Sequence, residues 1–367
     1  MTAPRTGGPR RVGPYTVLAR LDGEGSGLPV PERRFIARSA DGERTVLVGI
    51  PHEEADPGRF AAEAQVSRYL LGPYCAPAVE LSSPGEPPWH ARPYLPALPL
   101  PTAVAVNGAP LPERTVRALG AALAESLAVT HGQGLTHAGV SPAAVLLAAD
   151  GPRLTCFGAV RAAGEVGAPR AGRGLEPGSL PPEQAAGGIP DPLGDSYALG
   201  ATLAYAATGH TAPERDELPP GLRRVIRACL SRDPASRPRA AALLDEFTRD
   251  ADAASVRART EINLSGAVLD RSRTVIDRSD AVPDHPRTVI DRSGAAPVHP
   301  RTAVDRFAAV LAHPETVADR SVAARAAVLL GPGWLPGRVI AAIARQSAVI
   351  LAADLRGAPP APAHRQD

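Results

Sequence analysis

The sequence predicts an α+β domain in which an antiparallel sheet comes first and a mainly helical half follows. Between residues 15 and 50, three short runs of β-branched and aromatic residues alternate with turn signals. Helical periodicity appears later, from 112 to about 131 and from 195 to about 248. The chain has 367 residues, of which 44% are hydrophobic. That content is enough for at least one sizeable core.

The sheet is predicted from three strands. The first runs from Tyr15 to Asp22 and is followed by a glycine-rich turn with Gly23, Gly25 and Gly27. The second covers about 33–40, meets the hairpin signal Asp41-Gly42 and leads to a third strand at 44–50. The order predicts an antiparallel meander.

Helical spacing begins near Pro57 and returns between 112 and about 131. The expected buried stripes are Phe60, Ala64, Ser67 and Leu71 in the first helix, and Val116, Leu119, Leu123 and Leu127 in the second. Two apolar runs, 145–149 and 153–157, are joined by Asp150-Gly151 and predict a hairpin. Residues 195–248 are expected to be mostly helical.

The character of the chain changes after residue 248. A fourteen-residue repeat places Arg-Thr pairs at 259, 273, 287 and 301, with a weaker copy at 315. Few large apolar residues recur in each unit, so we expect a flexible linker over 249–320. Residues 334–355 then predict an amphipathic helix that either folds back on the domain or binds a partner. Its expected apolar face is Val339, Ile340, Ile343, Ser347 and Ile350.

Composition argues against several classes of protein. The formal net charge is only +2 and the arginines are spread along the chain, so we expect no nucleic-acid binding. Cys75, Cys156 and Cys229 form no CxxC pair, which argues against a disulfide framework or a zinc site and favours a cytoplasmic location. No stretch approaches the roughly 20 apolar residues of a membrane span.

Five segments, in order, resemble motifs of the bacterial eukaryotic-like (Hanks-type) serine/threonine protein kinases: 134–147, 151–158, 180–184, 194–209 and 229–238. The resemblance implies a bilobal protein-kinase-like fold over 13–248, with an antiparallel β N-lobe at 13–97 and a mainly helical C-lobe at 98–248. Around it we expect a disordered N-terminus (1–12), the repeat linker (249–320), a C-terminal helical segment (321–355) and a disordered tail (356–367).

The resemblance also shows which chemistry is missing. Gly49 stands where the family has its phosphate-binding lysine, and Glu63, the lysine's partner, would be left without a cation. Gly139 replaces the aspartate that accepts a proton, while Ala144 and Cys156 replace the two metal ligands. No metal site and no cofactor are expected, and the chain resembles a degenerate member, a pseudokinase.

Positions that hold the family's scaffold together are present. By resemblance, Asp195 anchors the catalytic-loop backbone and Glu183 pairs with Arg237, while His137 braces the loop and Phe157 belongs to the hydrophobic spine. The turn with Gly23, Gly25 and Gly27 departs from G-x-G-x-x-G and is a weak candidate for a phosphate cradle.

Three functions remain open. The chosen one is a catalytically silent signalling scaffold or allosteric partner of a protein such as a cognate kinase. The first alternative is an active kinase that uses ATP and magnesium, with Arg33, Arg34 or Arg44 reaching the phosphates.

The second alternative is a docking platform for a phosphothreonine-binding domain. An acidic residue lies three positions after each of the candidate phosphosites Thr274, Thr288 and Thr302. This spacing resembles the peptides bound by forkhead-associated domains, and repetition would raise avidity. The competing interpretation is an inert spacer produced by repeat slippage.

Overall fold

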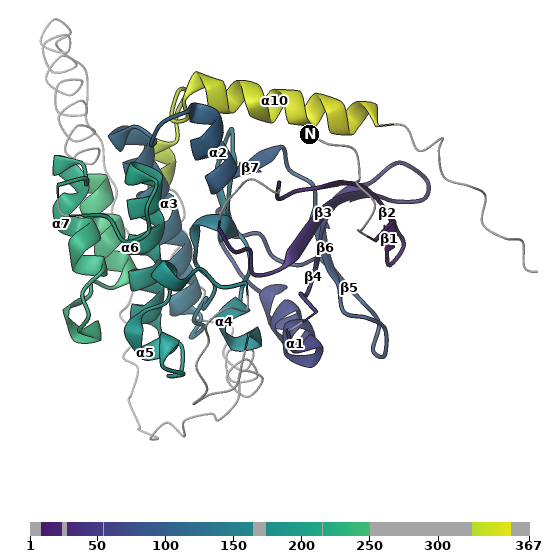
Figure 1. The fold of residues 1–367 in the computed structure, drawn as a ribbon, viewed down its shortest axis with the longest axis horizontal. Coiled ribbons are helices and arrows are strands. Elements are labelled where there is room, and N and C mark those ends of the chain that lie inside the picture. The colour runs from purple at the N-terminus through teal and green to yellow at the C-terminus, as the bar shows by residue number, and fades with distance from the viewer. Residues whose placement is uncertain are drawn as a thin grey trace, which may run out of the picture. The chain divides into compact units, whose positions relative to one another are not determined.

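The computed structural model describes residues 9–23, 28–53, 55–163, 174–214, 216–249 and 325–353. In this part of the chain the N-lobe is a six-stranded antiparallel sheet in the order β1-β2-β3-β4-β6-β5 (Figure 1). The strands are β1 (Arg11–Val12), β2 (Tyr15–Arg20), β3 (Arg33–Arg38), β4 (Thr45–Ile50), β5 (Glu80–Leu81) and β6 (His90–Pro93). The predicted meander is therefore confirmed.

The sheet has two buried faces. Because β3 and β4 pair along their whole length, Arg34 lies opposite Gly49 and Ile36 opposite Leu47. One face packs an aromatic cluster around Tyr15 and Trp89. The other face carries Ile36 and Leu47 into a cluster that includes Leu146 of the C-lobe, so this face joins the two lobes.

Helix α1 (Pro57–Ser67) begins at Asp56, whose carboxylate accepts hydrogen bonds from the backbone N–H groups of residues 58 and 59. Phe60, Ala64 and Ser67 are buried, as predicted. The prediction for Leu71 is wrong, because the helix ends at Ser67 and Leu71 is 54% exposed.

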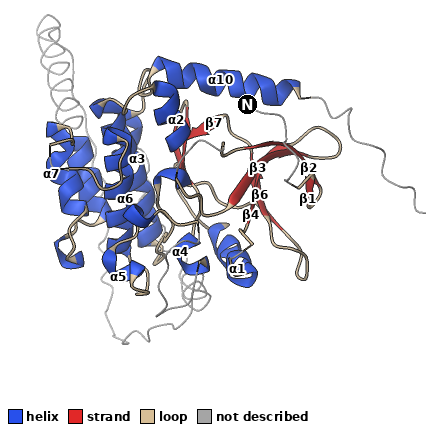
Figure 2. Ribbon diagram, in the orientation of Figure 1, coloured by secondary structure: helices blue, strands red, loops and turns tan. Residues whose placement is uncertain are grey.

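The C-lobe is mainly helical (Figure 2). Its helices are α2 (Leu100–Asn107), α3 (Glu113–Gly132), α4 (Ala159–Ala162), α5 (Pro182–Ala185), α6 (Pro192–Thr208), α7 (Pro220–Cys229) and a further helix at 240–249. Strands β7 (Ala97–Pro99), β8 (Val145–Ala148) and β9 (Gly151–Leu154) form a small antiparallel sheet, which contains the predicted hairpin. The predicted stripe of α3 is fully buried at Val116, Leu119, Leu123 and Leu127.

The C-terminal helix, α10 (Gly337–Ala352), packs against α2 and β7, so the described residues of 9–248 and 325–353 form one compact unit. Of the two alternatives left open by the sequence, the structure shows the helix folded back on the domain. Val339, Ile343 and Ile350 are buried. Ile340, predicted to share their face, is 37% exposed, and Ala342 is buried instead.

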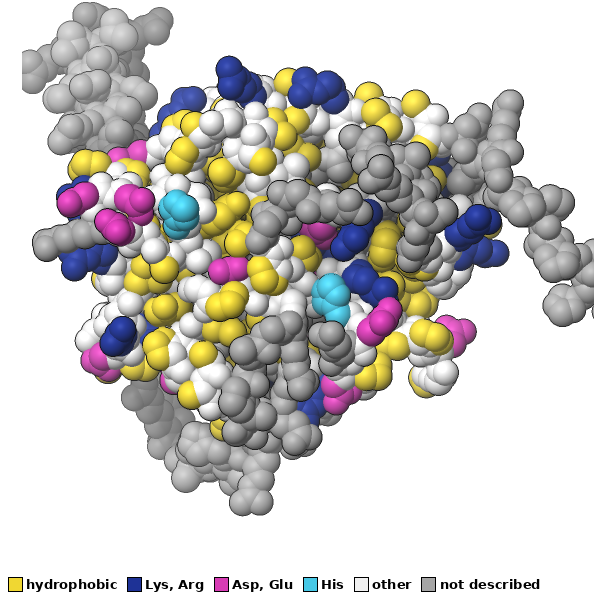
Figure 3. All heavy atoms as spheres, in the orientation of Figure 1, with side chains coloured by type: hydrophobic (Ala, Val, Ile, Leu, Met, Phe, Trp, Pro, Cys, Tyr) yellow, Lys and Arg dark blue, Asp and Glu magenta, His cyan; other side chains and the backbone are white. Residues whose placement is uncertain are grey.

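Several predictions fall outside the described residues. They concern Gly25 and Gly27 of the glycine-rich turn, the repeats with Thr274, Thr288 and Thr302, and the terminal tails. Within the described ranges, no helix combines the length and apolar character needed to cross a bilayer. On the face drawn in Figure 3, the basic and acidic side chains of these residues are interspersed.

Candidate functional site: the interlobe region

Asp195 holds the loop at 137–139 in place. It lies in the first turn of α6, which begins at the N-cap Asp191. The Asp195 carboxylate accepts hydrogen bonds from the backbone N–H groups of His137 (2.7 Å) and Ala138 (2.8 Å) and contacts His131 Nε2 at 2.9 Å. Ala138 adopts a φ of 51°, so these bonds secure a backbone conformation that is unusual for alanine.

His137 and Phe157 connect that loop to the next strand end. Their rings meet edge to face at 5.5 Å, and His137 O accepts the backbone N–H of Gly158 at 2.8 Å. His137 is fully buried, and burial lowers the pKa of its imidazole to about 4. The ring therefore acts as a neutral packing element at physiological pH.

Glu183 and Arg237 form an ion pair between α5 and the segment before the last C-lobe helix. Their side chains meet through two hydrogen bonds, at 2.6 and 3.0 Å, and Arg237 also donates to Ser231 O. Burial on its own would raise the pKa of Glu183, but the hydrogen bond with Arg237, a backbone hydrogen bond and the charge of Arg237 together lower it. This pair is a structural feature of the C-lobe.

Gly139, at the position of the proton acceptor, has no room for a side chain. A Cβ built there would overlap the carbonyl oxygen of Cys156 and lie 3.3 Å from the Ala159 methyl. The loop therefore packs directly on the backbone at 156, where a kinase would need space for a carboxylate and a substrate hydroxyl.

Ala144 and Cys156, at the two metal-ligand positions, offer no ligand. Ala144 is fully buried, and its carbonyl oxygen accepts both the N–H and the hydroxyl of Thr155. Burial, followed by the charge of Glu32, raises the pKa of Cys156 to about 12, so the thiol stays neutral and donates to Glu32 Oε1. A neutral thiol is a poor ligand for magnesium.

Gly49, at the lysine position on β4, faces a space that is already occupied. A Cβ there would lie 2.5 Å from His90 Cε1 and 2.9 Å from Glu32 Oε2. His90 and Glu32 contact each other at 2.7 Å and are both buried. Burial on its own would raise the pKa of Glu32, but His90, together with the charges of Arg92 and Arg34, lowers the pKa to about 2. A carboxylate-imidazole pair thus fills the place of the ammonium group.

Glu63 is not left without a cation, so that prediction is wrong. Both of its carboxylate oxygens accept hydrogen bonds from Arg161 of α4, each at 2.7 Å. Arg161 also donates to Thr136 O and lies over the Phe157 ring. The partner therefore comes from the segment after Gly158, and α1 is tied to the C-lobe.

Arg34 and Asp22 form a buried ion pair at the junction of the lobes. The Arg34 side chain is 0% exposed, and its guanidinium donates to Asp22 through Nε (2.9 Å) and Nη2 (2.5 Å). It also reaches the C-lobe, where it donates to Thr155 Oγ1 (3.1 Å) and Ala143 O (2.8 Å). Burial would lower the pKa of Arg34, but Asp22, together with Cys156 and Glu32, raises it.

These last two contacts fix the position of the guanidinium. Ala143 precedes Ala144 and Thr155 precedes Cys156, which are the two metal-ligand positions of the family. The Arg34 guanidinium therefore lies next to the two residues that the resemblance aligns with the family's metal ligands.

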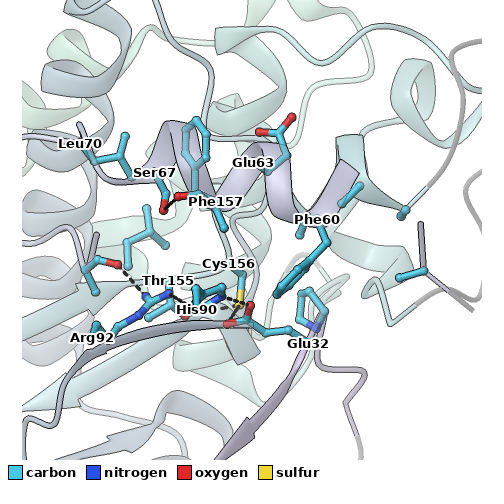
Figure 4. A pocket seen from close by; sticks show the side chains of 18 residues that line it. Glu32, Phe60, Glu63, Ser67, Leu70, His90, Arg92, Thr155, Cys156 and Phe157 are labelled. Carbon is cyan, nitrogen blue, oxygen red and sulfur yellow. Dashed lines mark hydrogen bonds and ion pairs between the residues drawn. The ribbon is translucent and has the colours of Figure 1, made fainter. Parts of the chain in front are cut away.

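Two cavities lie near this region in the part of the chain that the structure describes, and neither is lined by Arg34 or Asp22. A cavity between α1 and the sheet is lined by residues including Phe60, Glu63, Arg92 and Phe157 (Figure 4) and has a volume of about 30 Å³. A second cavity, beside Gly139, is about 20 Å³. Each has room for only one or a few water molecules.

The arginines considered as substitutes are engaged elsewhere. Arg33 donates to Pro51 O and pairs with Glu53, and Arg44 pairs with Glu80. Arg34 is the buried residue described above. Gly23, the described glycine of the turn, has nothing within 4 Å of a Cβ placed on it.

Sequence reasoning missed the polar residues that fill the site. They are Asp22, Glu32, His90, Arg92 and Arg161. One signal in the sequence pointed to a buried arginine. Arg33 and Arg34 are neighbours in a predicted strand, and because successive side chains point to opposite faces of a sheet, one of the two had to face its buried side. The others carry no local motif.

Comparisons with known proteins agree with the resemblance. No protein-family model matches the chain. The chain is 35% identical over 268 residues to the probable serine/threonine-protein kinase PkwA of Thermomonospora curvata. The aligned region covers 66% of this chain and 35% of PkwA. It is 34% identical over 257 residues to the serine/threonine-protein kinase AfsK of Streptomyces griseus, covering 63% of this chain and 31% of AfsK. The chain thus spans about a third of the length of these relatives.

Among solved structures, the kinase domain of PknI from Mycobacterium tuberculosis superposes with a TM-score of 0.49 at 24% identity. The match covers 65% of this chain and 96% of that domain. The sequence relatives support a kinase-like protein of the bacterial serine/threonine type.

Proposed function

We propose that this protein is a catalytically silent relative of bacterial serine/threonine kinases that acts as a signalling scaffold or allosteric partner of another protein. The observation that carries the proposal is the Arg34–Asp22 ion pair, whose guanidinium bonds the C-lobe at Ala143 and Thr155. Phosphoryl transfer requires magnesium and phosphate in that region. In this protein the guanidinium already has a carboxylate partner in Asp22, so it is not free to neutralise a phosphate group.

Three further positions support the same function. Gly139 and Gly49 have no room for the missing side chains, and the Cys156 thiol is held neutral. Each change removes a different requirement of the reaction: the proton acceptor, the phosphate contact and the metal ligand. A cytoplasmic location, predicted from cysteine usage, is part of the proposal.

The alternative of an active kinase would need a new side chain for each of these roles. The three arginines considered for phosphate binding already bond protein groups. No further acidic side chain replaces Gly139 among its described close neighbours, which are the backbone at 156 and Ala159. This alternative is therefore the weaker one.

The docking-platform alternative rests on the repeats alone. The Arg-Thr pairs recur every fourteen residues, and each is followed by an acidic residue. A test is to incubate the full chain with an active serine/threonine kinase and map phosphothreonine by mass spectrometry. Phosphate at Thr274, Thr288 or Thr302 would support docking, and none between 259 and 320 would remove it.

The silent-kinase proposal is tested by phosphate transfer from labelled ATP to a generic acceptor peptide. The matched control is the Arg34→Met variant, which alters the interlobe region and leaves any contaminating kinase unaffected. We expect equal background incorporation for both proteins. Incorporation by the wild type that exceeds background and is lost in the Arg34 variant would contradict the proposal.

A further inference from the structure

The segment 325–353 is anchored on the C-lobe at its beginning. Trp334 is 5% exposed, its indole Nε1 donates to Ala149 O at 2.8 Å, and its carbonyl accepts the Thr115 hydroxyl at 2.6 Å. The backbone N–H of Ala326 donates to the carboxylate of Glu125, which is fully buried on α3. These are specific polar bonds in a dry environment, where losing a partner is costly.

The other end of the same segment is anchored on the N-lobe. Arg38 of β3 donates to Ile350 O at 2.6 Å and to Ala353 O at 2.7 Å. Ile350 lies in the last turn of α10, where its carbonyl also accepts the N–H of Ala353, and Ala353 directly follows the helix. A cation is favourable at this end of a helix. Arg38 therefore caps the C-terminus of α10 from the sheet.

Ile350 adds an apolar contact at that end. Its side chain is 1% exposed and belongs to the buried cluster that contains Ile36 and Leu47 of the sheet together with Leu146 of the C-lobe. Between its two ends, α10 lies along α2 and β7, the segment through which the chain passes from one lobe to the other (Figure 2). One continuous helix thus contacts both lobes and the connection between them.

The chain returns to the domain close to the point where it departed. Arg325 bonds Asp245 Oδ1 at 2.5 Å and Thr248 Oγ1 at 2.8 Å, on the helix at 240–249. The intervening residues are therefore joined to neighbouring points on the C-lobe, and rebinding of 325–353 is intramolecular.

We infer that residues 325–353 form an interlobe strap that locks the N-lobe and C-lobe together. The inference rests on the proposed function, because in a silent kinase no nucleotide bridges the lobes and another element has to do so. The Arg34–Asp22 pair bridges them from inside, and the strap bridges them from outside. Release of the strap's C-terminal end would remove this outer bridge and loosen the N-lobe, while Trp334 kept the segment on the C-lobe.

The test uses full-length protein and hydrogen exchange followed by peptide. The first variant, Arg38→Met, removes the cap. The second, Ser347→Pro, interrupts the end of α10 and leaves every side chain of both lobes in place. Arg11→Met, on the exposed edge strand β1, is the matched control. In both test variants we expect exchange to accelerate about tenfold or more in α10 from 344 to 352 and also in β2 and β3.

The control should exchange at the wild-type rate in α10 and β3. If α10 loosens in both variants while β2 and β3 keep wild-type protection, the helix docks but does not lock the lobes, and the inference is wrong. Unchanged exchange in α10 itself would also overturn it. Nucleotide titration of the same proteins tests the silent-kinase proposal separately from the strap. Binding of Mg-ATP would contradict the silent-kinase proposal, whatever result the hydrogen-exchange experiment gives for the strap.

Discussion

The scaffold of the C-lobe and the interlobe region differ in how their family positions are used. In the scaffold, Asp195 makes backbone hydrogen bonds and Glu183 pairs with Arg237, and both are contacts that hold the fold. In the interlobe region, Gly139 and Gly49 stand at positions without room for a side chain. The difference teaches that the family positions that make contacts within the C-lobe are present as the resemblance expects, whereas the two glycines stand where a larger side chain would overlap its neighbours.

The largest expected effect comes from breaking the interlobe ion pair. Arg34→Met should lower the free energy of unfolding by about 3–5 kcal/mol, because it leaves the Asp22 carboxylate buried without a partner. Urea unfolding measures the change. Adding Asp22→Leu should recover much of the loss, since the uncompensated charge is then gone.

The control for that prediction is Arg33→Met, whose side chain is 33% exposed and makes a surface ion pair. It should change stability by less than about 1 kcal/mol. A cost for Arg34→Met no greater than that of Arg33→Met would show that the buried pair does not bridge the lobes.

The second prediction concerns pH and the scaffold side of the comparison. The pKa of His137 is about 4 in the folded protein and 6.5 ordinarily, so the unfolded chain binds the proton first as pH falls. The neutral His137 therefore contributes about 3 kcal/mol to the free energy of unfolding above pH 6.5, and this contribution is lost as pH falls toward 4. Glu32, with a pKa of about 2 instead of 4.5, acts in the same direction at lower pH.

Denaturant unfolding at pH 7 and pH 5 isolates the imidazole, because the carboxylate remains ionised at both. His137→Phe should flatten the pH dependence in this window, whereas His210→Phe, at an exposed position, should not. A wild-type slope that persists in His137→Phe would assign the effect to another group.

The third prediction sharpens the comparison at Gly139. Gly139→Asp should restore no phosphate transfer and should destabilise the domain by about 1–3 kcal/mol, because the new Cβ overlaps the backbone at Cys156. Thermal unfolding and the labelled-ATP assay give the two readouts. Unchanged stability together with new activity would mean that the loop opens easily.

The smallest of these effects is expected at the Glu63–Arg161 pair. Its side chains are 13% and 25% exposed, so solvent screens the charges in part. Arg161→Met should cost about 1–2 kcal/mol and increase hydrogen exchange in α1, since the hydrogen bonds to Thr136 and Glu63 are lost together. Exposed Arg68→Met is the matched control in the same region.

Local patterns predicted much of the fold. The strands at 15–20, 33–38 and 45–50, the buried stripe of α3 and the hairpin at 145–154 follow from periodicity and turn residues. Leu71 and Ile340 were placed wrongly because periodicity continues past a helix end and does not show which side of a helix meets the domain.

The site was predictable only in part. Resemblance located Gly49, Gly139, Ala144 and Cys156, but not what fills the space around them. Glu32 and His90 are 58 residues apart, and Glu63 and Arg161 are 98 residues apart. Pairings over such separations are set by tertiary packing, and no motif in the sequence records them.

Nucleotide binding tests the central claim most directly. Thermal unfolding of the full chain should be measured with and without millimolar Mg-ATP. A ligand present at 100 times its Kd would stabilise the folded state by about 2.7 kcal/mol, or roughly 5–10 °C in a domain of this size. The silent-kinase proposal predicts no shift. A saturable rise in the midpoint that depends on magnesium would show that nucleotide enters the site and would contradict the account.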